Sequence, residues 1–381
     1  MPYLWQNAGW PHLIYDESAF HSEFERVLSK AGELAGMQTG LSDEERFTAT
    51  INQLSEETVN SFAIEGENLD QQAIRASLTA SLTARDQTRA AGSYRRIADV
   101  MIDARDVITP MTVERLNNWH RLLFQNSHFL DDIGQLRTST DPMQVVTTKR
   151  GEVTEVHYET PPSSQLPQTM SALMEWIQQT GPKGTQAHSL QTPGRAALAH
   201  LKFETIHPYS DGNGRIGRAL ADYVAAQNPI LARAPFSMSR VIQRDKTSYY
   251  NALQTAQFYE PHAAQNALDV TPFVSWFTET MNQAIDQSAE WAHHINRRNR
   301  YFEKFSGQLN ARQEKALKEL FERGPERLDQ GLSSRRYRRT TDASRQTATR
   351  DLTDLVKKGA LRPPTGAGPS TSYAVNLPLE K

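Results

Sequence analysis

One short segment of this 381-residue chain gathers residue types that could do chemistry. It runs from His207 to Arg218 and reads HPYSDGNGRIGR. His207 is the only residue in the segment that can take up a proton near pH 7. Asp211 offers a hard oxygen ligand of the kind that suits Mg²⁺ bridging phosphate oxygens. These residue types predict a site where a proton acceptor and a metal-binding carboxylate share one loop.

The same segment predicts an anion site between two helices. Pro208 blocks continuation of the first helix, and Gly212 and Gly214 let the backbone turn sharply and approach a ligand. The second helix is expected to start near Gly214, so that its free N–H groups and positive dipole end face the loop. Arg215 and Arg218 share one face of that helix, where a polyphosphate would balance their charge. Together these are the parts of phosphoryl or nucleotidyl transfer.

Simpler interpretations of single elements stay open. A glycine-rich loop alone is often an ordinary turn, and a lone histidine beside a helix end is often a cap. A metal site built from His200, His207 and Asp211 is a weaker alternative, because this spacing matches no common zinc site.

The chain has no cysteine, which excludes a disulfide scaffold, a thiol nucleophile and a cysteine-ligated metal.

The elements that position this loop are predicted to be almost all helices. After Ser42, which forms a capping-box pattern with Glu45, apolar residues recur at helical spacing to about Glu65. Two β-prone runs around a glycine between Ser139 and Thr160 predict a hairpin. The other helices are expected at 18–34, 71–84, 90–104, 110–123, 163–179, 193–206, 214–226, 246–257 and 271 to about 300.

Composition limits the class of protein. The length favours two or three domains, and 38% apolar residues suffice for a real core. No apolar run is long enough to span a membrane, and the N-terminus lacks the pattern of an export signal, so we expect a soluble, cytoplasmic protein without a membrane partner.

Residues 307–381 carry 15 basic and 9 acidic residues, a net charge of +6, which leaves −8 for the rest of the chain. This basic tail is a mild indication of nucleic acid.

The loop resembles the signature of the Fic family, His-Pro-Phe-x-Asp/Glu-Gly-Asn-Gly-Arg-x-x-Arg, with Tyr209 in place of Phe as the one departure. The resemblance covers about residues 46–281, the flanks more loosely. It implies a mainly α fold, a Fic-type helical bundle with a β-hairpin flap beside the site, and the hairpin expected at Ser139 to Thr160 fits that flap. A homodimer is expected by family analogy only.

Most Fic proteins transfer AMP from ATP to a hydroxyl of a target protein, which would make this chain a protein adenylyltransferase. By resemblance, His207 is the general base for a Ser, Thr or Tyr hydroxyl, and Asp211 holds Mg²⁺ on the α- and β-phosphates. Gly212, Asn213 and Gly214 would line the anion hole, and Arg215 and Arg218 would bind the β/γ end of ATP. A branch of the family that transfers phosphate has Lys in place of Gly214, so the glycine favours nucleotidyl transfer. Tyr249, Tyr250 and Asn251 resemble the segment that packs on the adenine ring, with ordinary helix core as the alternative.

A second motif resembles the family's inhibitory sequence, Ser/Thr-x-x-x-Glu-Gly/Asn. It consists of Ser61, Glu65 and Gly66, at the end of the helix expected over about 43–65. The resemblance implies that Glu65 pairs with Arg218 and occupies the place of the γ-phosphate, which would hold ATP in an unproductive pose. Some inhibited Fic enzymes also remove AMP, and the sequence does not separate transfer from removal.

The predicted organisation has four parts, of which the last, residues 307–381, is the basic tail. Residues 1–40 form an N-terminal cap region resembling one of unknown function found before some Fic domains, in which Trp5 and Trp10 are expected to be packed core. Residues 41–110 form a helical region with the inhibitory helix, and 111–300 form the catalytic domain.

Residues 307–381 resemble a winged helix-turn-helix, with helices at 308–323, 332–339 and 344–358. Its third helix would expose Arg345, Gln346, Thr349 and Arg350 to a DNA groove. Winged helices also bind proteins or dimerise. A function that competes with AMP transfer is therefore that of a DNA-binding regulator whose Fic body senses nucleotide or modifies itself. A third possible function is transfer of another phosphate-containing group. The target protein is not readable from the sequence.

Overall fold

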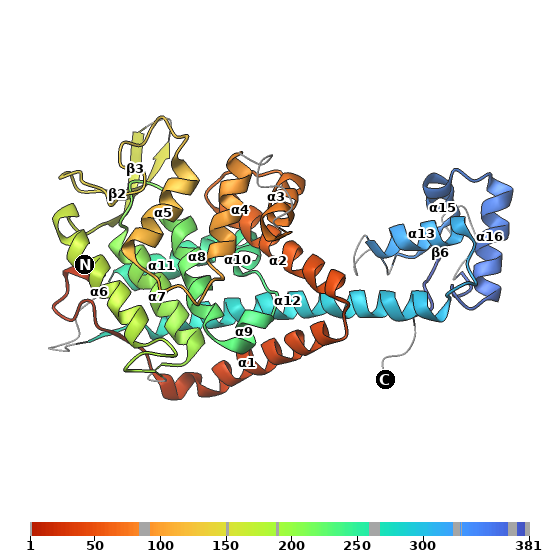
Figure 1. The fold of residues 1–381 in the computed structure, drawn as a ribbon, viewed down its shortest axis with the longest axis horizontal. Coiled ribbons are helices and arrows are strands. Elements are labelled where there is room, and N and C mark those ends of the chain that lie inside the picture. Colours follow the sequence, from red (N-terminus) through yellow and green to blue (C-terminus); the bar gives the residue numbers. More distant parts are fainter. Residues whose placement is uncertain are drawn as a thin grey trace. The chain divides into compact units, whose positions relative to one another are not determined.

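The computed structural model describes residues 2–83, 92–149, 152–187, 190–258, 267–322, 328, 330–364 and 372–377. The chain divides into two compact units, an N-terminal unit of residues 1–286 and a C-terminal unit of residues 287–381. The division falls within helix α12, Thr271–Lys304 (Figure 1). Across the described parts of the chain, no helix is long and apolar enough to cross a membrane.

The N-terminal unit is a bundle of helices around a central pair, α7 and α8 (Figure 1). Every residue of α7 from Pro193 to Ile206 is buried, and α8 is buried over most of its length. A helix that is buried all round belongs to the middle of a core. The helices of this unit are α1 Glu17–Thr39, α2 Asp43–Ile64, α3 Gln71–Thr83, α4 Ser93–Asp103, α5 Val113–Phe124, α6 Leu166–Gln179, α7 Thr192–Ile206, α8 Asn213–Ala226, α9 Pro229–Arg233, α10 Met238–Arg244, α11 Lys246–Gln257 and the first part of α12.

The ends of these helices follow the capping chemistry in the sequence. Ser42 and Glu45 form the expected capping box at the start of α2. Helix α1 is longer than expected, because Asp16 caps its start and it continues to Thr39. Helix α5 begins later than expected, at Val113, because Thr112 caps it. The expected helix boundaries at residues 84 and 90 lie outside the described residues.

The hairpin is present as expected, as strands β2 (Gln144–Lys149) and β3 (Glu152–Glu159). The strands are antiparallel, and their register shifts twice, after Val145 and after Thr147. The turn residues 150 and 151 lie outside the described residues. A second pairing is short and parallel, between β1 (Leu13–Ile14) and β4 (Leu268–Asp269), and it ties the N-terminal segment to the residues before α12.

The C-terminal unit has its own core, which includes Tyr301, Leu320, Tyr337, Leu352 and Leu361. It contains the end of α12, then α13 Ala311–Glu322, β5 Leu332–Ser333, α15 Ser334–Thr341, α16 Arg345–Lys357 and β6 Ser372–Tyr373, with β5 and β6 antiparallel. The expected β-wing consists of Leu361 to Arg362, a Gly/Pro-rich tip and Ser372 to Val375. Residues 365–371 of that tip and the expected helix end at residue 323 lie outside the described residues. The assignment as a winged helix stays a prediction.

Candidate active site

The loop between α7 and α8 is held in one conformation by its own side chains. His207 ends α7 in a left-handed conformation, with φ of +50°. Such a conformation costs free energy in a residue with a Cβ and is found at functional sites. Asn213 closes the loop, because its Oδ1 accepts the Tyr209 N–H at 2.9 Å and its Nδ2 donates to the Tyr209 carbonyl at 2.7 Å. The side chain of Asn213 thus fixes the backbone between the histidine and the helix.

Arg137 holds the backbone of His207 from outside the loop. Its Nε donates to the His207 carbonyl at 2.9 Å, its backbone N–H donates to the Pro208 carbonyl at 2.9 Å, and its Nη2 donates to the Pro161 carbonyl. The last contact joins the loop to the end of the hairpin. Enclosure by protein lowers the pKa of His207 to about 4, so its imidazole is neutral at pH 7 and able to accept a proton.

The first turn of α8 is closely approached by Phe124 and by the carboxylate of Glu65. Gly212 caps the helix with φ of +79°, and a Cβ there would meet the Phe124 ring at 2.3 Å. A Cβ on Gly214 would lie 2.3 Å from Oε1 of Glu65 and 3.1 Å from Nη1 of Arg218. Glu65 therefore places a carboxylate against the backbone of this first turn, where a negative charge is favoured.

Arg218 is buried and is held by the end of α2. Its Nε donates to Ser61 Oγ at 3.0 Å, and its Nη2 donates both to the Ser61 carbonyl at 2.8 Å and to Glu65 Oε1 at 2.9 Å. Burial opposes the charge of Arg218, but Glu65 raises the pKa of the guanidinium above its ordinary value. Nη1 is buried and has no hydrogen-bond partner among the described residues. This donor is available to a further anion.

Arg215 points to a different set of groups. Its guanidinium lies between the rings of Phe62 and Phe124, 5.1 and 4.7 Å from their centroids. Nη1 pairs with Glu67, and Nη2 lies 3.3 Å from Asp211 Oδ1. Both arginines at the start of α8 are thus paired with acidic residues that follow α2.

The end of α2 is attached to its surroundings by several polar contacts. The buried Glu57 carboxylate accepts from Ser237 Oγ at 2.7 Å, from the Ser239 N–H at 3.1 Å and from Ser239 Oγ. Lys246 Nζ donates to the carbonyls of Ala63 and Ile64, at 3.2 and 3.3 Å, which are free at a helix C-terminus. Glu65 follows directly, at the C-cap, and Gly66 takes a left-handed φ of +84°.

Asp211 is the residue that fits a magnesium ion in a nucleotide complex. No cluster of three or more His, Asp or Glu side chains that could enclose a metal occurs within the described ranges. Mg²⁺ does not need such a cluster, because it is commonly held by one or two carboxylates together with waters and substrate phosphates. Asp211 meets this requirement, since 56% of its side chain is exposed and it lies at the start of α8 beside the anion site.

The three residues expected at the adenine ring lie in two places, because Tyr249 and Tyr250 are neighbours, with ring centroids 5.2 Å apart, and Asn251 lies elsewhere. Tyr249 is buried, with its hydroxyl 3.1 Å from Nε2 of His200 and its ring against Trp276. Tyr250 is 46% exposed and donates to the Ile64 carbonyl at 3.4 Å, next to Glu65. Asn251 lines another cavity, of about 520 Å³, whose lining includes no residue of the loop. Both tyrosines therefore lie near Glu65 and Arg218, Tyr249 buried and Tyr250 at the exposed edge.

Sequence reasoning missed three residues of this site. Arg137 carried no signal, because its role depends on tertiary structure. Glu67 was visible as an acid two positions after Glu65, and it pairs with Arg215. Glu204 lies three positions before His207; its carboxyl is buried, Oε1 has no hydrogen-bond partner among the described residues, and burial raises its pKa to about 8. The available signal for Glu204 was its place as the one acidic residue of α7, close to His207.

Comparison with known proteins gives the class of the domain that contains this loop. Residues 110–225 match the model of the Fic/DOC family, and residues 3–83 match the model of a domain of unknown function, DUF4172. The chain therefore carries a Fic/DOC family domain, which contains the loop and the central helices around it.

Particular relatives agree with this class. The chain is 28% identical over 146 residues to a protein adenylyltransferase Fic of Drosophila grimshawi, and 31% identical over 126 residues to one of Nematostella vectensis. These matches cover 38% and 33% of this chain and 26% and 25% of the relatives, about a quarter of their length. A Fic domain containing signalling protein from Bacteroides thetaiotaomicron superposes with a TM-score of 0.50 at 21% identity, over 71% of this chain and 97% of that one. The structural similarity supports the expected mainly helical, Fic-type fold.

Proposed function

We propose that this protein transfers AMP from ATP to a Ser, Thr or Tyr hydroxyl of a target protein. The observation that carries the proposal is the pair of buried guanidinium groups at the start of α8. Arg218 Nη1 and Arg215 Nε have no hydrogen-bond partner among the described residues, although both atoms are buried. Leaving such donors unsatisfied costs free energy, so their arrangement favours an anionic ligand. The names of the curated relatives support ATP as the source of that anion.

In the proposed reaction the target hydroxyl oxygen attacks the α-phosphorus of ATP. The bond between the α-phosphorus and the bridging oxygen breaks, and pyrophosphate leaves. A ring nitrogen of His207 accepts the hydroxyl proton, which its low pKa permits at neutral pH. The N–H groups at the start of α8 and the two arginines stabilise the negative charge of the phosphates. Positioning and charge stabilisation supply most of the rate enhancement in this chemistry.

Asp211 would hold Mg²⁺ on the α- and β-phosphates, and the ion would neutralise charge there. Half of the Asp211 side chain is exposed, and its Oδ1 already accepts hydrogen bonds from the Gly212 N–H and from Arg215. These contacts orient the carboxylate before the ion binds.

The hairpin would position the target protein. Strands β2 and β3 pair only with each other among the described strands, so neither pairs with a third strand, and at the end of β3 the Glu159 carbonyl accepts from Trp5 Nε1 at 2.8 Å. An extended target segment could add to an edge of this hairpin through main-chain hydrogen bonds. Arg137 connects the end of this hairpin to the His207 backbone, so a strand added to the hairpin would lie near the proposed proton acceptor.

We further propose that the resting protein is autoinhibited by Glu65. Its carboxylate occupies the anion site against Gly214 and pairs with Arg218, so that the γ-phosphate of ATP would compete with it. In-line attack requires the phosphates in one specific pose, and transfer from a pose displaced by Glu65 would be slow.

Labelled nucleotides test which group is transferred. The Glu65→Gly variant, incubated with a cell lysate, should incorporate label from α-³²P-ATP and none from γ-³²P-ATP. Glu65→Gly combined with His207→Ala is the matched control and should incorporate neither. Incorporation of the γ-label would replace the proposed reaction with phosphate transfer, and absence of both labels would contradict the enzymatic proposal.

DNA binding by the C-terminal unit is a second candidate function. Arg345, Gln346, Thr349 and Arg350 are all exposed at the start of α16. This row of basic and polar side chains on one helix suits contacts to phosphates and base edges. If DNA binds here, the affinity for a duplex should fall steeply with salt, and Arg345→Ala together with Arg350→Ala should weaken it. Equal binding by wild type and this double variant would reject DNA contact through α16.

A further inference from the structure

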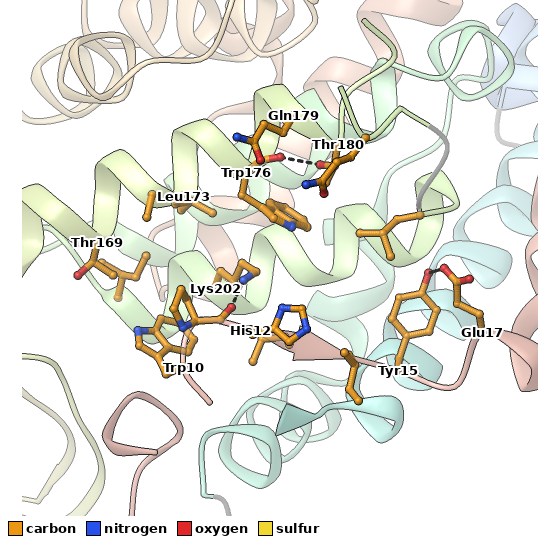
Figure 2. Close-up of a pocket in the computed structure, with 17 residues that line it drawn as sticks. Trp10, His12, Tyr15, Glu17, Thr169, Leu173, Trp176, Gln179, Thr180 and Lys202 are labelled. Carbon is orange, nitrogen blue, oxygen red and sulfur yellow. Dashed lines mark hydrogen bonds between the residues drawn. The ribbon is translucent and has the colours of Figure 1, made fainter. Parts of the chain in front are cut away.

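A large cavity of the N-terminal unit lies outside the candidate active site. It has a volume of about 700 Å³ and is formed by the N-terminal segment from Trp10 to Glu17, by α6 and by α7 (Figure 2). This volume is in the range of small-molecule sites. Its lining includes none of the residues from His207 to Arg218. The cavity is therefore a separate site, formed where the DUF4172 region meets the Fic domain.

The one lysine that lines this cavity, Lys202, is buried and has no acidic partner among the described residues. The residue is 5% exposed, and its Nζ donates to the Pro11 carbonyl. Two indole rings flank the same atom, with centroids 5.8 Å away for Trp10 and 5.1 Å away for Trp176. Burial lowers the pKa of Lys202 to about 8, which leaves it mostly charged at pH 7.

Such a cation is costly to bury, and an ammonium group has three N–H donors. The Pro11 carbonyl accepts one of them, and the indole faces supply weaker electrostatic partners. No carboxylate of the described chain compensates the charge. An anion in the cavity would provide the missing partner.

The remaining lining decides what kind of anion fits. It is largely apolar and aromatic, with Leu13, Ile14, Leu173 and Ile206 among its members. Figure 2 shows Trp10 at one end of the cavity, Tyr15 and Glu17 at the other, and Lys202 and Trp176 between them. Tyr15 donates to Glu17 at 3.3 Å, so this end is acidic. A strongly hydrated phosphate is disfavoured by apolar walls and by Glu17, whereas a monoanion with an apolar body satisfies both the lysine and the walls.

We propose that this cavity binds a small organic carboxylate with a flat apolar body, whose carboxylate group pairs with Lys202 and whose body packs against Trp10 and Trp176. The pairing supplies a buried, charge-assisted hydrogen bond, and the indole rings supply stacking surfaces. The inference does not depend on AMP transfer, because it concerns another cavity and another set of residues.

Calorimetric titration of the full-length protein with 2-naphthoate tests the proposal, with the neutral 2-naphthamide as the matched ligand. We expect 2-naphthoate to bind at one site with a Kd of about 1 mM or tighter, and 2-naphthamide to bind at least about tenfold more weakly. The Lys202→Met variant should bind both ligands with equal, low affinity, while Lys30→Met, which removes a lysine from α1, should keep the preference for the carboxylate.

Three results would overturn the proposal. The wild type could bind the acid and the amide with equal affinity, it could fail to bind the acid, or Lys202→Met could keep the preference for the acid. Should Lys202→Met not fold, Ala172→Phe provides a second test, because Ala172 is an exposed residue of α6 that lines the cavity, and a larger side chain there would reduce the space for the ligand while Lys202 remains. Loss of 2-naphthoate binding in Ala172→Phe supports the cavity as the site, and retained binding rejects it.

Discussion

Glu65 and Arg218 lie 153 residues apart in the sequence, yet Oε1 of Glu65 accepts a hydrogen bond of 2.9 Å from Nη2 of Arg218, directly beside the backbone of Gly214. One carboxylate thus contacts both the cationic side chain and the helix N-terminus that the proposed reaction would use for ATP. The strength of this contact depends on how firmly the end of α2 is held.

The attachment of α2 through Glu57 should limit the activity of the resting protein. Glu57→Gln replaces a carboxylate that accepts three hydrogen bonds from Ser237 and Ser239, and should lower the free energy of unfolding by about 1–3 kcal/mol. It should also raise AMP transfer, because the inhibitory end of α2 is released more often. Glu56→Gln is the matched control, since Glu56 makes one partly exposed pair with Arg240 and should change either quantity little. Unaltered stability and transfer in Glu57→Gln would contradict this role.

The pH dependence of transfer should reflect the enclosed imidazole. The pKa of His207 is lowered to about 4, so the fraction able to accept a proton should be nearly constant from pH 6 to 8. Between about pH 6.5 and 4 the unfolded state binds this proton and the folded state does not, so acidification destabilises the fold. The rate of AMP transfer by the Glu65→Gly variant should be measured between pH 5.5 and 8, with circular dichroism as the check on folding. A nearly constant rate from pH 6 to 8 is the expected result. A half-maximal rate near pH 6.5 with an intact fold would show an ordinary, exposed histidine.

Arg137 should act by positioning His207. Arg137→Met removes the Nε contact to the His207 carbonyl and the Nη2 contact to Pro161, and it leaves the backbone contact to Pro208. In the Glu65→Gly background we expect kcat to fall about 10- to 100-fold, while the KM for ATP changes little. Arg233→Met, at the surface end of α9, is the control. A rise in KM with constant kcat would assign Arg137 to nucleotide binding instead.

The C-terminal unit should depend on Asp351, which is buried within it. The Asp351 carboxylate accepts hydrogen bonds of 2.9 Å from Arg312 Nε and from the Tyr337 hydroxyl. Burial opposes the ionised form, but these two donors lower the pKa of Asp351 below its ordinary value. The stabilisation is therefore present at neutral pH and is lost as the pH falls through the lowered pKa.

Hydrogen exchange of residues 311–357 measures this effect. Asp351→Asn should destabilise these helices by about 1–3 kcal/mol, and Asp342→Asn, at an exposed position with φ of +53°, should not. Equal protection in both variants would show that Asp351 contributes no stability.

The parts of the fold and site that the sequence predicted are those determined locally. Ser42 and Glu45 define a helix start by their spacing, and the glycines and proline of the loop define a turn before a helix. The residues that depend on distant partners were less accessible. The burial of Tyr249 against Trp276, the contact of Arg137 with the His207 carbonyl, and the indoles around Lys202 each join segments far apart in the chain. Such contacts follow from tertiary packing, which no local pattern encodes.

The rate of AMP incorporation by Glu65→Gly relative to the wild type tests the central claim most directly. We predict a rise of at least about tenfold with α-labelled ATP, because the substitution removes the carboxylate from Arg218 and from the start of α8. Glu67→Gln is the matched control, since Glu67 pairs with the neighbouring Arg215 but is half exposed, and its effect should be much smaller. Equal rates in the wild type and Glu65→Gly, with both proteins folded, would contradict the account of Glu65 as the group that blocks the ATP site.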